Sequence, residues 1–247
     1  MRTIKTQEKA KSKVAPLPAN KRESRLVELL AFDQKLRAEH KGSLIIGVDE
    51  VGRGCLAGPV VAAAVCLPSM KANNPIATGL FELNDSKQLK AAQREKLNLT
   101  IREHAVWAIE AASVQEIDEL NIAYASLTAM RRAVHQLLDS ISASKVLVIV
   151  DGHMKIPDLN CRQMVIVKGD GLSAAIAAAS VIAKVHRDSY MRGLADSWPM
   201  YDWHNNKGYG SKIHRQAIIA HGVSVWHRKA FIARMMAALN QLKIEFE

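Results

Sequence analysis

The segment IIGVDEVGRGCLAGPVVAAAV, residues 45–65, constrains the fold more than any other part of the chain. An apolar run ends at Val48, carboxylates follow at Asp49 and Glu50, and a second apolar run starts at Pro59. Both runs contain β-branched residues, and the glycines between them favour a tight bend. The segment therefore predicts two consecutive strands joined by a glycine-containing loop, with acidic side chains where the first strand ends.

The same loop has the spacing of a dinucleotide-binding fingerprint, G-x-G-x-x-A, at Gly52, Gly54 and Ala57. That fingerprint needs a helix to begin at the glycines, so that the helix N-terminus meets the pyrophosphate. Here a strand-like Pro-Val-Val run follows instead. The fingerprint also needs an acidic residue about 20 positions later, and none lies between Val51 and Phe81. A nucleotide cofactor is therefore not expected.

The remainder of the chain alternates strands with helices. Strands are expected at residues 43–48, 59–67, 105–114, 145–152 and 161–170. Helices are expected at residues 23–40, 85–104, 114–138, 172–194, 212–221 and 226–241. Asp85 or Ser86 is expected to cap the second helix, and the third is expected to be interrupted near Asn121. This order predicts an α/β domain built on a mixed sheet.

Composition excludes several classes of protein. The 247 residues suffice for one sizeable domain or two small ones. Cys55, Cys66 and Cys161 are far apart and form no C-x-x-C pair, so neither a disulfide nor a zinc site is expected. No apolar run approaches the ~18 residues of a membrane span, and the N-terminus lacks a secretory signal. These features predict a cytoplasmic protein without a membrane partner.

Basic residues are concentrated at the N-terminus. Up to Arg22 there are seven basic residues against Glu8 alone, which gives +6 of the net charge of +10. A segment with so few apolar residues cannot bury enough surface to fold, so we expect a flexible basic arm. Either a solubility tail or added affinity for a polyanion would explain such an arm.

Carboxylates end two of the expected strands. Asp49 and Glu50 close the first strand, and Asp151 closes the strand at 145–152. Adjacent parallel strands would place them on one rim of the sheet, where α/β folds have their sites. Three such carboxylates repel one another unless a hard cation neutralises them, and Mg²⁺ and Mn²⁺ suit an all-oxygen set. Two ions about 3.5–4 Å apart would hold a phosphodiester and activate water. The alternative is solvated acids that cap loops.

These segments together resemble the bacterial ribonuclease HII family, the type 2 ribonucleases H. The resemblance covers residues 44–231 and rests on several motifs in the same order. They are DEVGRG at 49–54 with LAGPVVAAAV at 56–65, LNDSKQL at 83–89, VDG at 150–152, KGD at 168–170, AAASVIAKVHRD at 177–188, NKGYGSKIH at 206–214 and HRKAF at 227–231. Residues 153–155, His-Met-Lys, depart from the family pattern beside Asp151, which reflects either a solvent-facing loop or an altered metal preference.

The resemblance implies a ribonuclease H-like fold, with a mixed five-stranded sheet flanked by helices. Composition and the resemblance together divide the chain into a basic arm (1–22), an N-terminal helix (23–43), a catalytic domain (44–195) and a helical substrate-binding extension (196–247). The resemblance implies hydrolysis of RNA in RNA–DNA hybrids and incision 5′ of ribonucleotides embedded in duplex DNA, which leaves 3′-hydroxyl and 5′-phosphate ends. That reaction belongs to ribonucleotide excision repair. Two Mn²⁺ or Mg²⁺ ions and a monomeric state are also expected.

The resemblance also assigns site residues. The residues implied to bind both metals and carry out catalysis are Asp49, Glu50, Asp151 and Asp188. Those implied to bind substrate are Gly52, Arg53 and Gly54, whose backbone would read the 2′-hydroxyl, Tyr209, which would stack at the ribonucleotide–deoxyribonucleotide junction, and Lys87 and Lys184, which would contact phosphates. From its spacing alone, Asp188 instead predicts an i,i+4 ion-pair ladder with Lys184 and Arg192 on a solvated face.

Some alternatives stay open at the level of sequence. Another two-metal nuclease or a recombinase on the same fold would share the carboxylates but need no 2′-hydroxyl reader. A non-catalytic hybrid-binding protein would need no carboxylates. The aromatic residues at 198, 201 and 203 predict either a hydrophobic cluster that anchors the Tyr209 loop or a base-stacking platform. The histidines at 204, 214, 221 and 227 lack zinc-ligand spacing, and we expect them to contact phosphate or cap helices.

Overall fold

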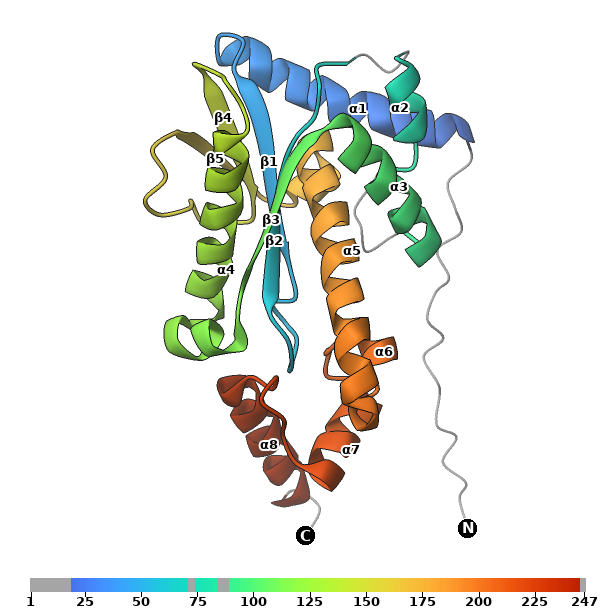
Figure 1. Ribbon diagram of the computed structural model, residues 1–247, viewed down its shortest axis with the longest axis vertical. Coiled ribbons are helices and arrows are strands. Elements are labelled where there is room, and N and C mark those ends of the chain that lie inside the picture. Colours follow the sequence, from blue (N-terminus) through green and yellow to red (C-terminus); the bar gives the residue numbers. More distant parts are fainter. Residues whose placement is uncertain (1–18, 71–73, 84–88, 245–247) are drawn as a thin grey trace.

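A computed structural model describes residues 19–70, 74–83 and 89–244 (Figure 1). At its centre is a five-stranded mixed sheet with the strand order β3-β2-β1-β4-β5. β1 pairs with β4 in parallel and with β2 in antiparallel orientation, so β1 is the central strand. The strands are β1 (Leu44–Val51), β2 (Val60–Cys66), β3 (Val106–Ala112), β4 (Val146–Asp151) and β5 (Arg162–Ile166). The predicted mixed five-stranded sheet is confirmed.

Helices cover both faces of the sheet. α4 (Val114–Asp139) lies on one face and α5 (Ala174–Ser197) on the other (Figure 1). β2 is buried along its whole length because its alternate side chains enter different cores. Val61, Ala63 and Val65 pack with α5, and the residues between them pack with α4. A strand enclosed on both faces is therefore apolar throughout, as the sequence of β2 indicates.

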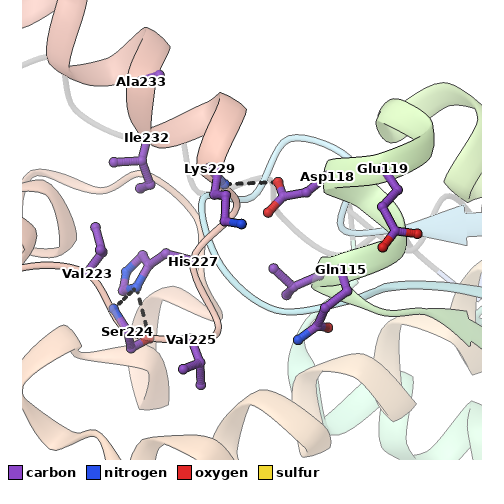
Figure 2. Close-up of a pocket in the computed structure, with 11 residues that line it drawn as sticks. Gln115, Asp118, Glu119, Val223, Ser224, Val225, His227, Lys229, Ile232 and Ala233 are labelled. Atoms are coloured by element: carbon purple, nitrogen blue, oxygen red, sulfur yellow. Dashed lines mark hydrogen bonds between the residues drawn. The ribbon is translucent and has the colours of Figure 1, made fainter.

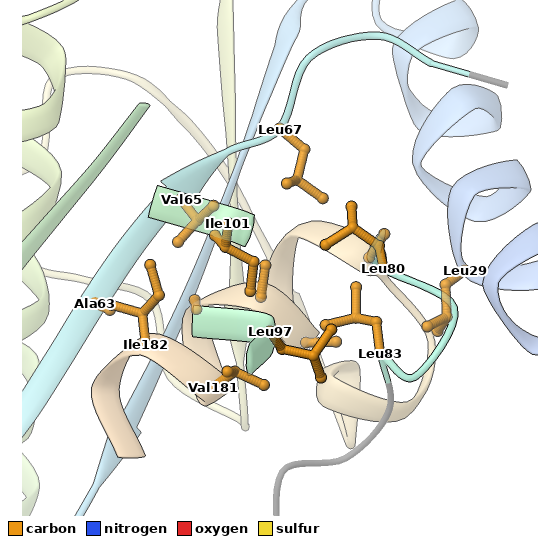
Figure 3. Close-up of a cluster of buried hydrophobic side chains, with 14 of the residues drawn as sticks. Leu29, Ala63, Val65, Leu67, Leu80, Leu83, Leu97, Ile101, Val181 and Ile182 are labelled. Atoms are coloured by element: carbon orange, nitrogen blue, oxygen red, sulfur yellow. The ribbon is translucent and has the colours of Figure 1, made fainter. Parts of the chain in front are cut away.

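Three further helices complete the α5 side of the molecule. They are α1 (Ala19–Glu39), α2 (Pro75–Gly79) and α3 (Ala91–His104). Leu29 of α1 and Leu97 and Ile101 of α3 meet Val181 and Ile182 of α5 in one hydrophobic cluster (Figure 3). α5 is therefore packed between the sheet on one side and α1 and α3 on the other.

α5 approaches the sheet closely because the residues at the contact are small. A Cβ atom added at Gly47 of β1 would lie 2.2 Å from the carbonyl carbon of Ala175. Six alanines occur between Ala174 and Ala183, and all are buried. The close contact brings the later part of α5, which carries Asp188, alongside the carboxyl end of β1.

Several helix boundaries differ from those that the sequence predicts, and α1 begins at Ala19, four residues earlier than predicted. α3 begins at Ala91, six residues later than predicted, with Lys90 at its N-cap position, and the predicted caps Asp85 and Ser86 lie outside the described residues. The predicted interruption of α4 is confirmed at Asn121, whose φ is 65° and whose Oδ1 accepts a hydrogen bond from the Ala123 N–H at 2.9 Å. α8 (Lys229–Ile244) begins three residues later than predicted because residues 226–228 contact the loop after β1 instead.

The C-terminal helices lie beyond the carboxyl end of β1 (Figure 1). They are α6 (Trp203–Asn206), α7 (Lys212–His221) and α8. Tyr201 and Trp203 are buried between them with ring centroids 5.0 Å apart, which supports the packing role rather than a stacking platform. Within the described residues, no helix is long and apolar enough to cross a membrane.

Candidate active site

Three of the predicted carboxylates meet at the carboxyl ends of β1 and β4. Val48 pairs with Val150 in the parallel register, so the residues that follow, Asp49 and Asp151, lie side by side. The Asp49 side chain is buried. Its pKa lies well above the usual value, first because burial disfavours the charged form and then because Glu50 and Asp151 are negatively charged neighbours. The predicted juxtaposition of two strand-end acids is therefore present in the structure.

Main-chain and cationic groups hold each of these carboxylates. The Glu50 N–H donates to Asp49 Oδ1 at 2.8 Å, and the Gly169 N–H donates to Asp151 Oδ1 at 2.7 Å. Arg53 Nη1 lies 3.2 Å from Glu50 Oε1. Burial raises the pKa of Glu50, and the charge of Arg53 opposes that shift. The three carboxylates are therefore oriented before any ligand binds.

Asp188 contacts residues outside this group. Its Oδ1 is 2.7 Å from Lys184 Nζ, and its Oδ2 is 3.9 Å from Arg94 Nη2. The predicted ion pair with Lys184 is present, but Asp188 is only 8% exposed rather than solvated. Arg192 pairs with Glu95 at 3.3 Å instead of with Asp188.

The position of Ser180 on α5 indicates how far Asp188 lies from the other acids. Ser180, eight residues earlier on the same face of α5, contributes a side-chain hydrogen bond to Asp49. Eight residues of α-helix span ~12 Å. The structure therefore brings Asp49, Glu50 and Asp151 together and places Asp188 farther along the adjoining helix.

The chemistry of this group fits a hard divalent cation. All four donors are carboxylates, which Mg²⁺ and Mn²⁺ prefer. A cation would offset both the burial of the Asp49 charge and the repulsion from Glu50 and Asp151, which together raise the pKa of Asp49. Glu50 and Asp151 also line a cavity of about 110 Å³. In the part of the chain that the structure describes, no three His, Cys, Asp or Glu side chains form a ready-made metal-binding group.

The loop after β1, residues 52–58, is packed against α5 at one glycine and open at another. Gly52 has a φ of +98°, and a Cβ atom there would lie 2.2 Å from Arg187 Nε. At Gly54 an added Cβ atom would meet nothing within 4 Å, and its φ is not positive. The Cys55 N–H donates to the Gly52 carbonyl at 3.3 Å, which closes a turn around Arg53 and Gly54. The turn presents Gly54 to solvent.

Two buried arginines that the sequence analysis missed hold this loop. Arg187 of α5 donates to the carbonyl oxygens of Pro59, Lys207 and Ala57 at 2.9, 2.9 and 3.0 Å. Arg228 donates to the carbonyl oxygens of Arg53 at 3.0 Å and of Gly58 at 2.8 and 2.9 Å. Both side chains have no exposed surface. In the sequence, only their position within the motifs HRD and HRK could have indicated these two arginines. That position does not distinguish a buried arginine from one that contacts phosphate.

Tyr209 lies beside the same loop. It forms an isolated bridge with Cys55, and its side chain is 40% exposed. Desolvation of the part that is covered raises its pKa to about 12. Lys184 Nζ lies 5.5 Å from the centroid of its ring. The predicted neighbours Gly54, Tyr209 and Lys184 are therefore close together, whereas Lys87 lies outside the described residues.

A buried pair of histidines, His214 and His227, contacts the main chain at Tyr209. His214 Nδ1 lies 2.9 Å from the Tyr209 carbonyl oxygen, and His214 Nε2 lies 3.1 Å from His227 Nε2. The prediction that these two histidines contact phosphate or cap helices is wrong. Burial lowers the pKa of both, to about 4 for His227, so both are neutral at pH 7.

Comparison with known proteins identifies the family. The model of the family described as ribonuclease HII matches residues 46–237. A ribonuclease HII from Koribacter versatilis is 44% identical over 236 residues, which cover 94% of this chain and 87% of the relative. The chain belongs to the ribonuclease HII family. As a member of it, the chain is a metal-dependent endoribonuclease that acts on RNA–DNA hybrids.

Solved structures of ribonucleases HII and HIII share the fold. A chain in the structure of the PCNA:RNase HII complex from Archaeoglobus fulgidus aligns with a TM-score of 0.59 at 23% identity, covering 75% of this chain and 94% of that one. Bst-RNase HIII in complex with Mn²⁺ aligns with a TM-score of 0.59 at 20% identity, covering 83% of this chain and 67% of that one. At these identities the likeness concerns the fold.

In this ribonuclease HII family member, a second cavity lies apart from the carboxylates. It measures about 610 Å³ and lies between the start of α4 and residues 223–233 (Figure 2). The Lys229 N–H donates to Asp118 Oδ1 at 3.0 Å across it, which joins the C-terminal helices to α4. None of the predicted site residues lines this cavity.

Proposed function

We propose that the chain incises duplex DNA on the 5′ side of embedded ribonucleotides, as well as cleaving the RNA strand of hybrids, and leaves 3′-hydroxyl and 5′-phosphate ends. Such a reaction would serve ribonucleotide excision repair. The observation that carries the proposal is the position of the 52–58 loop, which follows directly from Asp49 and Glu50 on β1. A loop with an open main chain thus adjoins the acidic centre. The monomeric state and cytoplasmic location stay predictions.

The four carboxylates would hold the divalent ions. Asp49, Glu50 and Asp151 would provide the common set of ligands, and Asp188 would join them from α5. Bound Mg²⁺ or Mn²⁺ would supply charge neutralisation, a water of lowered pKa and stabilisation of the leaving oxygen. The Gly169 N–H holds one oxygen of Asp151 and leaves the other to bind.

Groups around the carboxylates would bind the substrate. The main chain of Gly52, Arg53 and Gly54 would meet the 2′-hydroxyl, which distinguishes RNA from DNA. Support for this comes from Gly54, where neither a positive φ nor a neighbouring atom of the protein requires glycine. The half-exposed ring of Tyr209 would stack at the junction with the following deoxyribonucleotide. Lys184, and Lys87 from outside the described residues, would contact phosphates.

The test is incision of a DNA duplex that carries one ribonucleotide, in magnesium or manganese. We expect the wild type to cut at the ribonucleotide and Asp151→Asn to lose more activity than the ~10–100-fold typical of changes outside the ligand set. An all-DNA duplex of the same sequence is the control. Cutting of that duplex would favour a two-metal nuclease that does not read the 2′-hydroxyl. Binding without cutting by the wild type would favour a hybrid-binding protein.

A further inference from the structure

Arg228 connects the C-terminal part of the chain to the turn at Arg53 and Gly54. It lies immediately before α8, has no exposed surface, and donates from Nη1 to the Arg53 carbonyl at 3.0 Å. Its Nε and Nη2 donate to the Gly58 carbonyl at 2.9 and 2.8 Å. Burial lowers the pKa of Arg228 to about 10, so the guanidinium stays charged at pH 7. Charge-assisted hydrogen bonds of this kind are stronger than neutral ones.

The bond from Arg228 determines where the next N–H group points. All described peptide bonds are trans, and in a planar trans peptide the C=O and the N–H point in opposite directions. The Arg53 carbonyl points inward to a buried guanidinium. The N–H of the same peptide, which belongs to Gly54, therefore points outward from the loop.

This peptide is the one that a turn can most easily reverse. It is the central peptide of the turn closed by the Cys55 N–H and the Gly52 carbonyl. Type I and type II turns differ by a flip of that peptide, and the type II form requires a positive φ at the third residue, which glycine tolerates. Gly54 does not have a positive φ here. The bond from Arg228 therefore selects one of two orientations that a glycine at position 54 leaves accessible.

Gly54 itself indicates that something outside the protein approaches it. Its φ does not need glycine, and an added Cβ atom would meet nothing within 4 Å. At Gly52 and Gly58, by contrast, positive φ values and contacts with Arg187 or Met191 explain the glycines. An open glycine with an outward N–H offers a donor that a sugar can reach closely.

We propose that Arg228 is a positioning residue for ribonucleotide recognition: it holds the Arg53–Gly54 peptide so that the Gly54 N–H faces the 2′-hydroxyl of the substrate. This inference rests on the proposed function, in which the main chain of the 52–58 loop reads that hydroxyl. Arg228 touches neither substrate nor reacting atoms and acts through the peptide it holds.

The experiment measures preference for a ribonucleotide in chains that do not cleave. In an Asp151→Asn background, dissociation constants are measured in magnesium for two duplexes of one sequence, one all-DNA and one with a single ribonucleotide. We expect Arg228→Lys, which cannot donate to both carbonyls as the guanidinium does, to reduce the ratio of these constants by about three- to tenfold, the range that one hydrogen bond supplies. Binding of the all-DNA duplex should change less than the ratio does.

Arg187→Lys in the same background is the matched control. Arg187 is equally buried and also donates three hydrogen bonds to carbonyl oxygens, but none belongs to Arg53. We expect this variant to keep the preference for the ribonucleotide. An equal loss of preference in both variants would show a general disturbance of the loop and would overturn the inference.

The outcomes separate the inference from the proposed function. If the Asp151→Asn chain with Arg228 intact shows no preference, reading of the 2′-hydroxyl is wrong and the inference fails with it. If that preference exists and survives Arg228→Lys, the inference alone is wrong.

If Arg228→Lys does not fold, amide hydrogen exchange of the chain with Arg228 intact tests the inference instead. The Gly54 amide should exchange freely, whereas the Leu56 amide, bonded to the Gly208 carbonyl at 2.8 Å, should be protected. A protected Gly54 amide would overturn the inference.

Discussion

Gly52 and Gly54 stand two residues apart, but glycine serves a different purpose at each. Gly52 has a φ of +98° and lies against Arg187, so the fold itself requires it. Gly54 has neither constraint. Substitution of the two glycines therefore distinguishes a requirement of the protein from a requirement of the substrate.

We predict that Gly54→Ala keeps the stability of the wild type but lowers incision at a ribonucleotide by ~10²-fold, because a methyl group displaces the sugar from the main chain. Gly52→Ala should lower the free energy of unfolding by ~1–2 kcal/mol or more, since alanine is strained at positive φ. Thermal unfolding and single-turnover incision of both variants provide the check. Full activity of Gly54→Ala would contradict close approach of the sugar.

The histidine pair behind Tyr209 has a defined arrangement of protons. His227 Nδ1 accepts from the Ser224 N–H at 2.9 Å, so its proton lies on Nε2 and points to His214 Nε2. His214 then carries its own proton on Nδ1, which faces the Tyr209 carbonyl. A second proton on His214 would lie on Nε2, which already accepts from the Trp203 Nε1–H and faces the His227 proton, so the pair favours neutral rings.

We predict that acid weakens the fold through His227. Its pKa is about 4 in the folded chain and 6.5 without the fold. Between these values the unfolded chain binds a proton that the folded chain does not, so the free energy of unfolding falls by up to ~3 kcal/mol as the pH drops from 7 to 4. Denaturant unfolding at several pH values measures this slope. The control, His227→Asn, should have a flatter profile in that window, and equal slopes would exclude this origin.

At the scale of elements, α1 supports the beginning of α5. Asp33 Oδ2 accepts from the Ala175 N–H at 2.9 Å, and Arg25 donates to the Gly171 carbonyl. The same segment provides the Gly169 N–H that holds Asp151. α1 thus contacts the turn on which the orientation of the Asp151 carboxylate depends, although it lies outside the residues that the family model matches.

We predict that the effect of Asp33→Asn on stability depends on pH. Burial raises the pKa of Asp33 to about 6 from 3.8. Between those values the folded chain holds a proton that the unfolded chain has lost, so the stability associated with Asp33 is lost as the pH rises through 6. The free energy of unfolding of Asp33→Asn, relative to the wild type, should therefore increase by up to ~3 kcal/mol from pH 4 to pH 8. A constant difference would mean that Asp33 does not titrate in this range.

The elements that a sequence predicts best are the ones with strong patterns. β1, β2 and β4 follow from continuous apolar runs, and the interruption of α4 follows from an asparagine that tolerates positive φ. α2 and α6 are too short to show a helical period. The start of α3 is missed because apparent capping residues precede it.

Some site residues can likewise be predicted from the sequence and others cannot. The acids at the ends of β1 and β4 are predictable because parallel strands end at one edge of a sheet. The position of Asp188 and the burial of Arg187 and Arg228 are not, because both depend on packing between distant segments. The division of the chain at 22, 43 and 195 stays a prediction, and residue 195 itself lies within α5.

At the scale of the whole molecule, we expect the N-terminal basic residues to affect affinity for a duplex more than preference for a ribonucleotide. Residues 1–18 carry five basic side chains, at positions 2, 5, 9, 11 and 13. We predict that replacing these five by glutamine weakens binding to any duplex and reduces the slope of log K against log salt by up to ~4, since each phosphate contact contributes ~0.9. The preference for a ribonucleotide should stay unchanged. An unchanged slope in a salt titration would favour the solubility tail.

The hydrogen bonds of the 52–58 loop also have a consequence for the order of assembly. The loop is held by partners far along the chain, since the bond between Arg228 and Arg53 spans 175 residues. During synthesis at ~5–20 residues per second, the turn around Gly54 would wait ~10–35 s for that partner. The acidic edge needs only β1 and β4, so it can form earlier. A nascent chain would thus bring Asp49 and Glu50 beside Asp151 before it forms the contacts that we propose to select the substrate, so its selectivity would mature last.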